Sequence, residues 1–471
     1  MSTRFIGRSA ELNWLEENYA DESASFLILY GRRRIGKTET LRRFTETKPR
    51  VIFYTGTEVS AAEQLNAFSR RILPVLPDIA RFVDTFTSWE QAFAALATLS
   101  GNQKTILVLD ELPYIVHSSP ELPSVLQKLW DETLRNRNIM IILCGSSLSF
   151  MEDEILGSKN PLYGRATGIL KMEELNVFDA CTFFPEYTLE EKLTAYALLG
   201  GIPHYLNQFD SAVPLAENIR KNILAKTSVL YSEIELIMHE EFREPAVYNA
   251  IITAIALGNT TLSDIHQRTM VDKTKLSAYL KNLMTVGIIT REFPVTSSLK
   301  ERTNLHRGIY RITDNYFRFY YRFVYPNVSE LELDGSSSIY THVIAPHLDA
   351  YTSRIFEDVA LSYLRARNRA GELPFFMTSS GKWWSKTDEI DLVGFSETGT
   401  CMIAGECKYT HAPVDIDVLA GLERKVSAFT GSVEKPYFYL FSRSGFTAKL
   451  TATAASRNDV ELVSLSDMFP E

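Results

Sequence analysis

The chain has 471 residues, and 49 Lys and Arg residues against 58 Asp and Glu residues give it a formal net charge of −9. This acidic balance excludes a protein that coats nucleic acid with positive charge over its whole surface, so a nucleic-acid contact requires a local basic patch. The length predicts about three domains. No apolar run reaches about 18 residues, so we expect no membrane span.

The composition also favours a cytoplasmic protein. The first residues, Met1–Ser9, lack the apolar core of a signal peptide. The four cysteines lack the spacing of zinc ligands, which favours reduced thiols. These cysteines are Cys144, Cys181, Cys401 and Cys407.

The first informative segment is an apolar run, Phe26–Tyr30, followed by a glycine loop and a segment with helical spacing, Glu39–Phe44. The loop, Gly31–Thr38, matches G-x-x-x-x-G-K-[ST], and a strand, loop and helix in this order are typical of a phosphate-binding P-loop. Lys37 would reach the β- and γ-phosphates, and the Thr38 hydroxyl would ligate Mg²⁺. The residues expected to contact the nucleotide are Gly31, Arg34, Ile35, Gly36, Lys37, Thr38 and Glu39.

Further strands alternate with helical stretches, which predicts an α/β domain with a parallel sheet. They are expected at Val51–Thr55, Thr105–Asp110, Met140–Gly145 and Gly168–Met172. Asp110 at a strand end would hold the Mg²⁺ water shell, and Glu111 would polarise the attacking water. Ser146 follows the next strand, where it would sense the γ-phosphate; a simple strand-ending turn is the alternative.

Two later features extend this site. Arg165 would supply positive charge to the transition state, with a structural ion pair as an equal alternative. Gly200-Gly201-Ile-Pro203 breaks a charged helical region, either as a bend that touches the nucleotide or as an ordinary helix break.

Together these motifs resemble the archaeal-type ATPases of the AAA+/STAND group over most of residues 1–210. The shared motifs are Phe5-Ile-Gly-Arg8-Ser-Ala-Glu11-Leu, Gly31–Thr38, Leu109-Asp110-Glu111, Cys144-Gly-Ser146-Ser147, Pro161-Leu-Tyr-Gly-Arg165 and Gly200-Gly-Ile-Pro203. The resemblance implies that Arg8 flanks the base, Ser146 acts as sensor 1, Arg165 is an arginine sensor, and Pro203 packs near adenine.

The middle of the chain has the pattern of a winged helix. Leu262–Arg268 and Lys273–Met284 read as two helices joined by a turn, and Arg291–Arg307 would form the wing. Leu262–Arg311 holds nine Lys and Arg residues against four Asp and Glu residues. The second helix would enter the major groove of DNA with Lys273, Lys275, Tyr279 and Lys281 on or near its exposed side. The alternative is a winged helix used for domain packing.

Carboxylates gather in the last part of the chain. Glu357 lies on an expected helix, while Asp391 and Glu406-x-Lys408 lie on expected neighbouring strands. Residues two apart on a strand share a face, so Glu406 and Lys408 would point the same way. Asp391 and Glu406 would bind Mg²⁺, Glu357 would complete the metal shell, and Lys408 would orient water or stabilise charge. Charged pairs on a solvated sheet face would give the same pattern.

This set is similar to the PD-(D/E)xK nuclease core, and the whole chain resembles archaeal-type ATPases that carry such a C-terminal domain. All four motif positions are filled. The expected fold class is therefore α/β: a P-loop NTPase with a parallel sheet and a helical lid, a winged helix, and a restriction-endonuclease-like domain. The expected boundaries are 1–173 for the ATPase core, 174–244 for the lid, 245–325 for the winged helix, 326–349 for a polar linker and 350–471 for the nuclease-like domain.

The sequence thus predicts an ATPase that uses ATP and Mg²⁺ and engages DNA through the winged helix. Its C-terminal domain would either cut the DNA, as a Mg²⁺-dependent deoxyribonuclease, or grip it. The alternative is a regulatory switch or DNA-binding module in which the C-terminal fold serves only in interaction. An oligomer is compatible with either interpretation.

Overall fold

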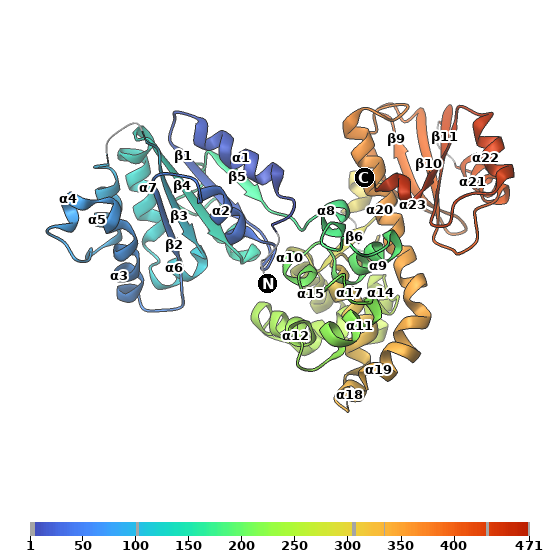
Figure 1. The fold of residues 1–471 in the computed structure, drawn as a ribbon, viewed down its shortest axis with the longest axis horizontal. Coiled ribbons are helices and arrows are strands. Elements are labelled where there is room, and N and C mark those ends of the chain that lie inside the picture. The colour runs from blue at the N-terminus through green and yellow to red at the C-terminus, as the bar shows by residue number, and fades with distance from the viewer. Residues whose placement is uncertain (1–4, 100–102, 304–307, 334, 430–432, 470–471) are drawn as a thin grey trace. The chain divides into compact units, whose positions relative to one another are not determined.

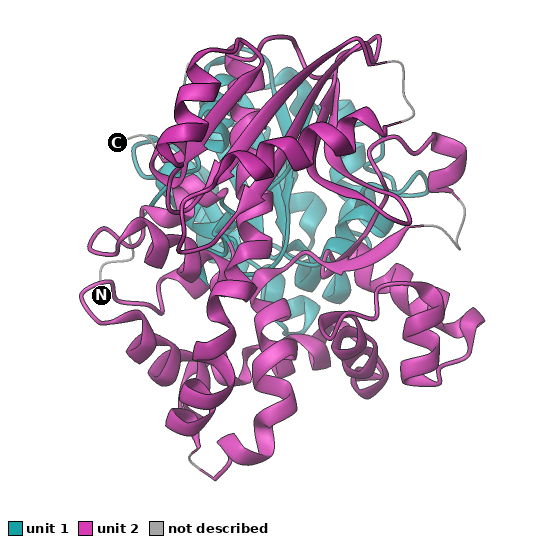
Figure 2. Cartoon of the chain, turned by 90° about the vertical axis from the view of Figure 1, so that its right-hand side faces the viewer, with its two compact units in different colours: residues 1–175, 201–204 teal, residues 176–200, 205–471 magenta. Residues whose placement is uncertain are grey.

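The computed structural model describes residues 5–99, 103–303, 308–333, 335–429 and 433–469. The chain forms two compact units (Figure 2). Unit 1 comprises residues 1–175 and 201–204, and unit 2 comprises residues 176–200 and 205–471. Both contain helices and sheets, so the predicted α/β class is confirmed.

A parallel five-stranded sheet forms the centre of unit 1 (Figure 1). Its order is β2-β3-β4-β1-β5, and every neighbouring pair runs parallel. The strands are β1 (Ser25–Tyr30), β2 (Val51–Thr55), β3 (Thr105–Asp110), β4 (Ile139–Gly145) and β5 (Gly168–Lys171). All five predicted strands are confirmed, with ends that match or differ by one residue.

Helices cover both faces of this sheet, which is why every residue of β1, β3 and β4 is buried. The helices are α1 (Ser9–Ala20), α2 (Lys37–Thr45), α3 (Ala61–Ile72), α4 (Pro77–Ala80), α5 (Trp89–Leu96), α6 (Leu112–Ser118) and α7 (Leu122–Glu132). The core on one face joins alternate residues of the strands to α3, α5, α6 and α7. Figure 1 shows α1 and α2 on the other face.

Unit 2 begins with a helical part. Its helices are α8 (Val177–Cys181), α9 (Leu189–Leu199), α11 (Leu215–Asn218), α12 (Val229–Glu241), α13 (Pro245–Ala256), α14 (Leu262–Thr269), α15 (Lys273–Thr285), α16 (Leu299–Arg302) and α17 (Asn315–Phe319). The short helix α10 (Pro203–Leu206) begins in unit 1 and ends in unit 2. A two-stranded antiparallel sheet, β6 (Ile289–Glu292) and β7 (Ile309–Ile312), follows α15. Residues 304–307 of the predicted wing lie outside the described residues.

The stretch predicted as a polar linker contains short helices, α18 (Val328–Leu331) and α19 (Ser336–Ile339). Leu331, Ile339 and Ile344 are buried, so apolar anchors hold this segment against the rest of unit 2. The predicted boundaries at 174–244, 245–325 and 350 stay predictions, since the whole region from residue 205 belongs to one compact unit.

A mixed five-stranded sheet ends the chain, with the order β12-β11-β10-β9-β8. Its elements are α20 (Leu348–Ala370), β8 (Ser379–Trp384), β9 (Glu389–Phe395), β10 (Cys401–Lys408), α21 (Ile416–Ser427), β11 (Lys435–Ser442), α22 (Ala448–Ala455), β12 (Val460–Ser464) and α23 (Leu465–Met468). Strands β8, β9 and β10 are antiparallel neighbours, whereas β10, β11 and β12 run parallel. Among the described residues no helix is long and apolar enough to cross a bilayer.

Candidate functional site

The P-loop connects β1 to the first turn of α2. Gly36 precedes this helix with φ 94°, a left-handed conformation that glycine adopts without strain. The Lys37 side chain is buried, and its Nζ donates to the carbonyl oxygens of Gly31 at 2.8 Å and Arg32 at 2.7 Å. Burial lowers the pKa of Lys37, although the nearby Glu111 and Asp110 oppose that shift. The ammonium group therefore lies inside the loop that would surround the phosphates.

The loop approaches the end of β5 closely at Gly31, which explains why a glycine is needed there. A Cβ added at Gly31 would lie 2.4 Å from the carbonyl oxygen of Met172. Any side chain there would push the loop away from the strand.

The predicted magnesium and water-activating residues meet at the carboxyl end of the parallel sheet. The Thr38 hydroxyl donates to Asp110 Oδ2 at 2.9 Å, across 72 residues of sequence. The Glu111 backbone N–H donates to Asp110 Oδ1 at 3.0 Å, and the Ser146 hydroxyl donates to Glu111 Oε2 at 2.7 Å. A hydroxyl oxygen beside a carboxylate, next to a buried lysine, is a donor set that suits Mg²⁺ bound to a nucleotide.

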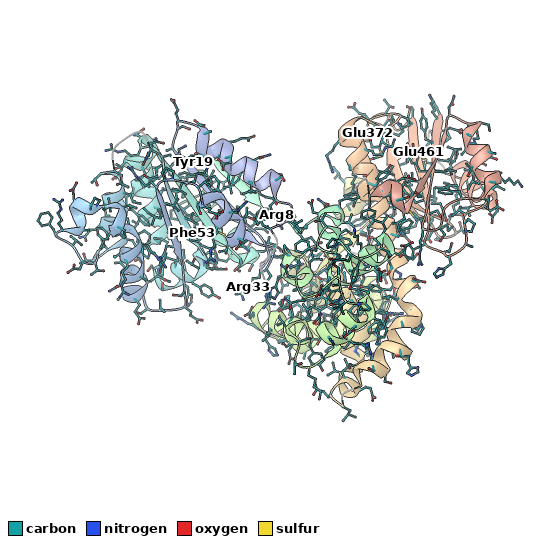
Figure 3. All side chains as sticks on the ribbon, in the orientation of Figure 1. Arg8, Tyr19, Arg33, Phe53, Glu372 and Glu461 are labelled. Atoms are coloured by element: carbon teal, nitrogen blue, oxygen red, sulfur yellow. The ribbon has the colours of Figure 1, made fainter. Side chains whose placement is uncertain are left out.

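Arg8 braces the loop from the N-terminal side. Its guanidinium donates to Glu11 Oε1 at 2.7 Å, to the carbonyl oxygen of Glu173 at 2.7 Å and to that of Ile35 at 2.8 Å. Figure 3 labels it together with Arg33 of the P-loop. Arg8 thus binds groups of the protein itself, while its predicted contact with the base stays a prediction.

The Gly201–His204 segment also lies beside the P-loop. The Pro203 ring lies 3.9 Å from the Cβ position of Gly36, and Leu175 donates its N–H to the Gly201 carbonyl at 2.8 Å. Of the remaining predicted loop residues, Ile35 is buried, whereas Arg34 and Glu39 are exposed. Glu39 lines a cavity of about 780 Å³ with Phe5 and residues of α2, β2 and α3.

Arg165 lies at the amino end of the parallel strands, whereas the P-loop lies at their carboxyl end. It precedes β5, and Thr167 just after it donates its N–H to Phe26 near the start of β1. The P-loop follows the other end of β1, about 15–20 Å away along a strand of this length. Arg165 Nη2 pairs with Asp131 at 3.1 Å. The structure therefore does not bring Arg165 to the P-loop of its own chain.

The C-terminal candidates come together from three elements. Asp391 lies on β9, Glu406 and Lys408 on β10, and Glu357 on α20. The Cys407 backbone N–H donates to Asp391 Oδ2 at 2.9 Å, and Lys408 Nζ pairs with Glu406 Oε1 at 2.8 Å. Burial raises the pKa of Asp391 to about 7, and the neighbouring Glu357 and Glu406 carboxylates add to that shift. All four predicted residues thus lie in one electrostatic cluster.

Two lysines that sequence reasoning missed also belong to this cluster. Lys425 on α21 pairs with Glu406 Oε2 at 2.8 Å, and Lys382 on β8 pairs with Glu357. No linear motif marks them, because a helix and a strand outside the E-x-K hairpin bring them in.

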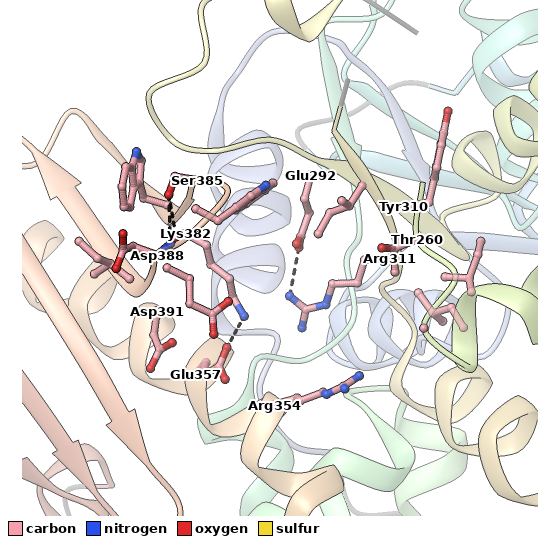
Figure 4. Close-up of a pocket in the computed structure, with 18 of the residues that line it drawn as sticks. Thr260, Glu292, Tyr310, Arg311, Arg354, Glu357, Lys382, Ser385, Asp388 and Asp391 are labelled. Carbon is pink, nitrogen blue, oxygen red and sulfur yellow. Dashed lines mark hydrogen bonds and ion pairs between the residues drawn. The ribbon is translucent and has the colours of Figure 1, made fainter. Parts of the chain in front are cut away.

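A cavity of about 740 Å³ opens on one side of the cluster. Figure 4 shows Asp391, Glu357 and Lys382 on one wall and Arg311 of β7 on the other. Glu406 and Lys408 are not among its lining residues. In the described part of the chain no three His, Cys, Asp or Glu side chains are arranged to hold a metal ion by themselves. Mg²⁺ commonly uses only one or two carboxylates plus substrate phosphates, so the pair on the wall suits it with a phosphate ligand present.

The predicted nucleic-acid residues of the middle segment lie on α15. Lys273, Lys275 and Lys281 are exposed, while Tyr279 is half-buried and donates to Glu244 at 2.7 Å. The three lysines are thus accessible to solvent, and their contact with nucleic acid stays a prediction.

Known proteins resemble both parts of the chain. Residues 5–209 match a family described as "ATPase domain predominantly from Archaea", and residues 320–426 match one described as "Archaea bacterial proteins of unknown function". The uncharacterized protein MJECL04 of Methanocaldococcus jannaschii is 34% identical over 405 residues, which cover 86% of this chain and 87% of that protein. The uncharacterized ATP-binding protein MJ0423 of the same organism is 46% identical over 44 residues, 9% of this chain and 75% of that protein. Among solved structures, the Walker-type ATPase PABY2304 of Pyrococcus abyssi has a TM-score of 0.49 and 22% identity, covering 68% of this chain and 97% of that one.

Proposed function

Because this chain belongs to the family of MJECL04 and carries an ATPase domain of the kind found predominantly in Archaea, we propose that unit 1 binds and hydrolyses ATP with Mg²⁺. The observation that carries the proposal is the 2.9 Å contact between the Thr38 hydroxyl and Asp110, beside the buried Lys37. Bound Mg²⁺ would neutralise charge on the β- and γ-phosphates.

The residues of the chain then have distinct roles. The N–H groups of the P-loop and the start of α2 bind phosphate oxygens, and Lys37 adds a charge there. Glu111 accepts the proton of the attacking water, and Ser146 holds the Glu111 carboxylate in place through its 2.7 Å hydrogen bond. A role for Arg165 at this site requires a second copy of the chain, because in its own chain Arg165 lies at the other end of the strands from the P-loop.

Measurement of ATP binding and turnover tests this proposal. Lys37→Ala should lower turnover by about 100-fold or more, because it removes the positive charge that stabilises the transferred phosphoryl group. Glu111→Gln should retain ATP binding and lower turnover by about 10²–10⁴-fold. Lys128→Ala, an exposed lysine of unit 1, is the control. Undiminished hydrolysis in Glu111→Gln would show that Glu111 is not the base.

A second activity, Mg²⁺-dependent cleavage of nucleic acid in unit 2, is favoured by the cluster of Glu357, Asp391, Glu406 and Lys408. Asp391 and Glu357 would hold the metal beside a phosphodiester, Glu406 would support it, and Lys408 would orient water or stabilise charge. The exposed lysines of α15 would bind the phosphate backbone as part of a winged helix.

The test is a nicking assay on plasmid and oligonucleotide DNA with Mg²⁺. Lys408→Ala and Asp391→Asn should abolish cleavage, whereas Lys449→Ala on the exposed side of α22 should not. If the native chain cleaves no substrate, the alternative of an ATP-dependent switch or DNA-binding module takes its place.

A further inference from the structure

The cavity beside the carboxylate cluster is held between two segments of unit 2. The Val295 N–H, in the loop after β6, donates to the Lys382 carbonyl of β8 at 2.8 Å. Arg311 of β7 pairs with Glu292 at 3.0 Å and with Asp358 of α20. The Val295 bond joins the β6–β7 hairpin to the C-terminal sheet, and the Arg311–Asp358 pair joins it to α20, so the two sides of the cavity are linked.

Side chains of both charges line the cavity. The carboxylates of Asp391, Glu357, Asp388 and Glu389 share their side of it with Lys382, Lys386 and Arg354, while Arg311, Arg318 and Glu292 come from β6, β7 and α17. Figure 4 shows Lys382 beside Glu357 and Arg311 beside Glu292. A phosphate group bound in the cavity would meet cationic donors close to a metal-binding carboxylate pair.

Arg354 and Lys386 are the two lining cations without an ion pair or side-chain hydrogen bond to a described residue, and Arg354 lies on the same helix as Glu357. It lies one turn before Glu357 on α20, lines the cavity, and is exposed. It makes no hydrogen bond or ion pair with any described residue, whereas Arg311, Arg318 and Lys382 all have protein partners. A guanidinium in this state offers all its donors to a phosphate.

The cavity also offers an aromatic face. Trp383 and Trp384 are adjacent on β8, and both line the cavity. Trp383 packs edge-on against Phe429 of the C-terminal core, with ring centroids 5.3 Å apart. Trp384 is only half-buried and makes no ring contact within the described parts of the chain. Its indole is therefore available for stacking.

We propose that this cavity binds a single strand of nucleic acid, with one base stacked on Trp384 and the adjoining phosphate held by Arg354 beside Asp391 and Glu357. The inference rests on the second activity proposed above and specifies its substrate. A cavity of about 740 Å³ lies within the roughly 300–1,000 Å³ range of small-molecule sites. That volume suits a nucleotide unit, and a base paired in a duplex cannot offer its face to an indole in a side pocket.

The binding of a fluorescein-labelled oligothymidylate to the full-length chain in EDTA tests the proposal without cleavage. Trp384→Ala should weaken binding by roughly 5- to 150-fold, and Trp384→Phe should retain most of it. Arg354→Ala should weaken binding and lessen its salt dependence. Phe376→Ala, an exposed aromatic side chain outside the cavity, is the matched control and should bind normally.

The outcomes separate this inference from the cleavage proposal. Loss of single-strand binding in Trp384→Ala and Arg354→Ala supports the inference even if Mg²⁺ gives no cleavage. Duplex cleavage that survives both substitutions, with unchanged single-strand binding, overturns the inference and leaves the nuclease. Free thymidine monophosphate that competes as well as the oligonucleotide would also overturn it, because the site would then bind a mononucleotide.

Discussion

Asp391 connects the chemistry of the C-terminal cluster to stability. Its pKa is raised to about 7 by burial and by the Glu357 and Glu406 carboxylates. Because this carboxyl group binds its proton more tightly in the folded state, the free energy of unfolding falls as pH rises from about 4 to about 7. The folded chain is therefore penalised for this carboxylate above about pH 7 and not below about pH 4.

We expect Asp391→Asn to stabilise the C-terminal sheet above about pH 7, by up to about 4 kcal/mol, and to have little effect near pH 4. Asn keeps an oxygen that accepts the Cys407 N–H. Urea unfolding in EDTA, followed by tryptophan fluorescence at several pH values, measures the difference. A change in stability that is the same at every pH would contradict the assignment.

Arg8 illustrates how two ion pairs of the same spacing differ in energy. Arg8–Glu11 and Arg43–Glu46 both join residues three apart, but the Arg8 side chain is 6% exposed and the Arg43 side chain 60% exposed. We expect Arg8→Ala to destabilise unit 1 by about 3–5 kcal/mol, because the Glu11 carboxylate and the carbonyl oxygens of Ile35 and Glu173 lose their hydrogen-bond donor. Arg43→Ala should cost less than about 1 kcal/mol. Thermal unfolding distinguishes this bracing role from base contact, which would weaken ATP binding and leave the unfolding temperature unchanged.

At the scale of elements, the sequence specifies the ATPase core well. Buried parallel strands read as continuous apolar runs, and β1, β3 and β4 have that signal, while the edge strands β2 and β5 are only partly buried. Gly31–Thr38 was recognisable because a P-loop requires glycines, a lysine and a hydroxyl residue at set positions, and Asp110-Glu111 because it stands at the end of the expected strand β3. The placement of Arg165 was not predictable, because its motif does not indicate at which end of the strands the arginine lies.

The C-terminal cluster shows the same division. The E-x-K spacing on a strand predicted a shared face, and that is where Glu406 and Lys408 pair. Lys382, Lys425 and Arg354 come from other elements with no motif of their own, so only tertiary packing reveals them. Likewise, the stretch before α20 was predicted as a linker from its polar residues, although Leu331, Ile339 and Ile344 are buried there and short helices form.

Gly201 offers a prediction about an element boundary. A Cβ at this position would lie 1.9 Å from the carbonyl oxygen of Leu175, a rigid backbone atom. We expect Gly201→Ala to destabilise the chain by more than about 1–3 kcal/mol through overpacking. Gly421→Ala within α21, where the nearest atom is a flexible arginine tip 3.7 Å away, should instead be neutral or stabilise by up to about 1 kcal/mol. Urea unfolding of the two variants provides the comparison.

At the scale of the whole molecule, the chain crosses between the units at three points: after Leu175, after Gly200 and after His204. The four residues 201–204 belong to unit 1, although the chain on both sides of them belongs to unit 2. Within unit 1, Pro203 lies against Gly36 of the P-loop. A nucleotide that orders the P-loop would therefore restrain a segment tied covalently to unit 2 at both ends.

This arrangement predicts that ATP stabilises the crossing segment itself. In Glu111→Gln, which should hold ATP without hydrolysing it, amide hydrogen exchange at residues 201–206 should slow by about 10-fold or more at saturating ATP, because ligand binding stabilises the closed state by mass action. In Lys37→Ala the same amides should exchange at the rate of the nucleotide-free chain. Pro203→Gly should keep ATP binding but lose much of the slowing, since it removes the ring that touches the loop and loosens the backbone. If exchange slows in the P-loop of Glu111→Gln but not at 201–206, the crossing does not respond to nucleotide, and any coupling between the two units must take another route.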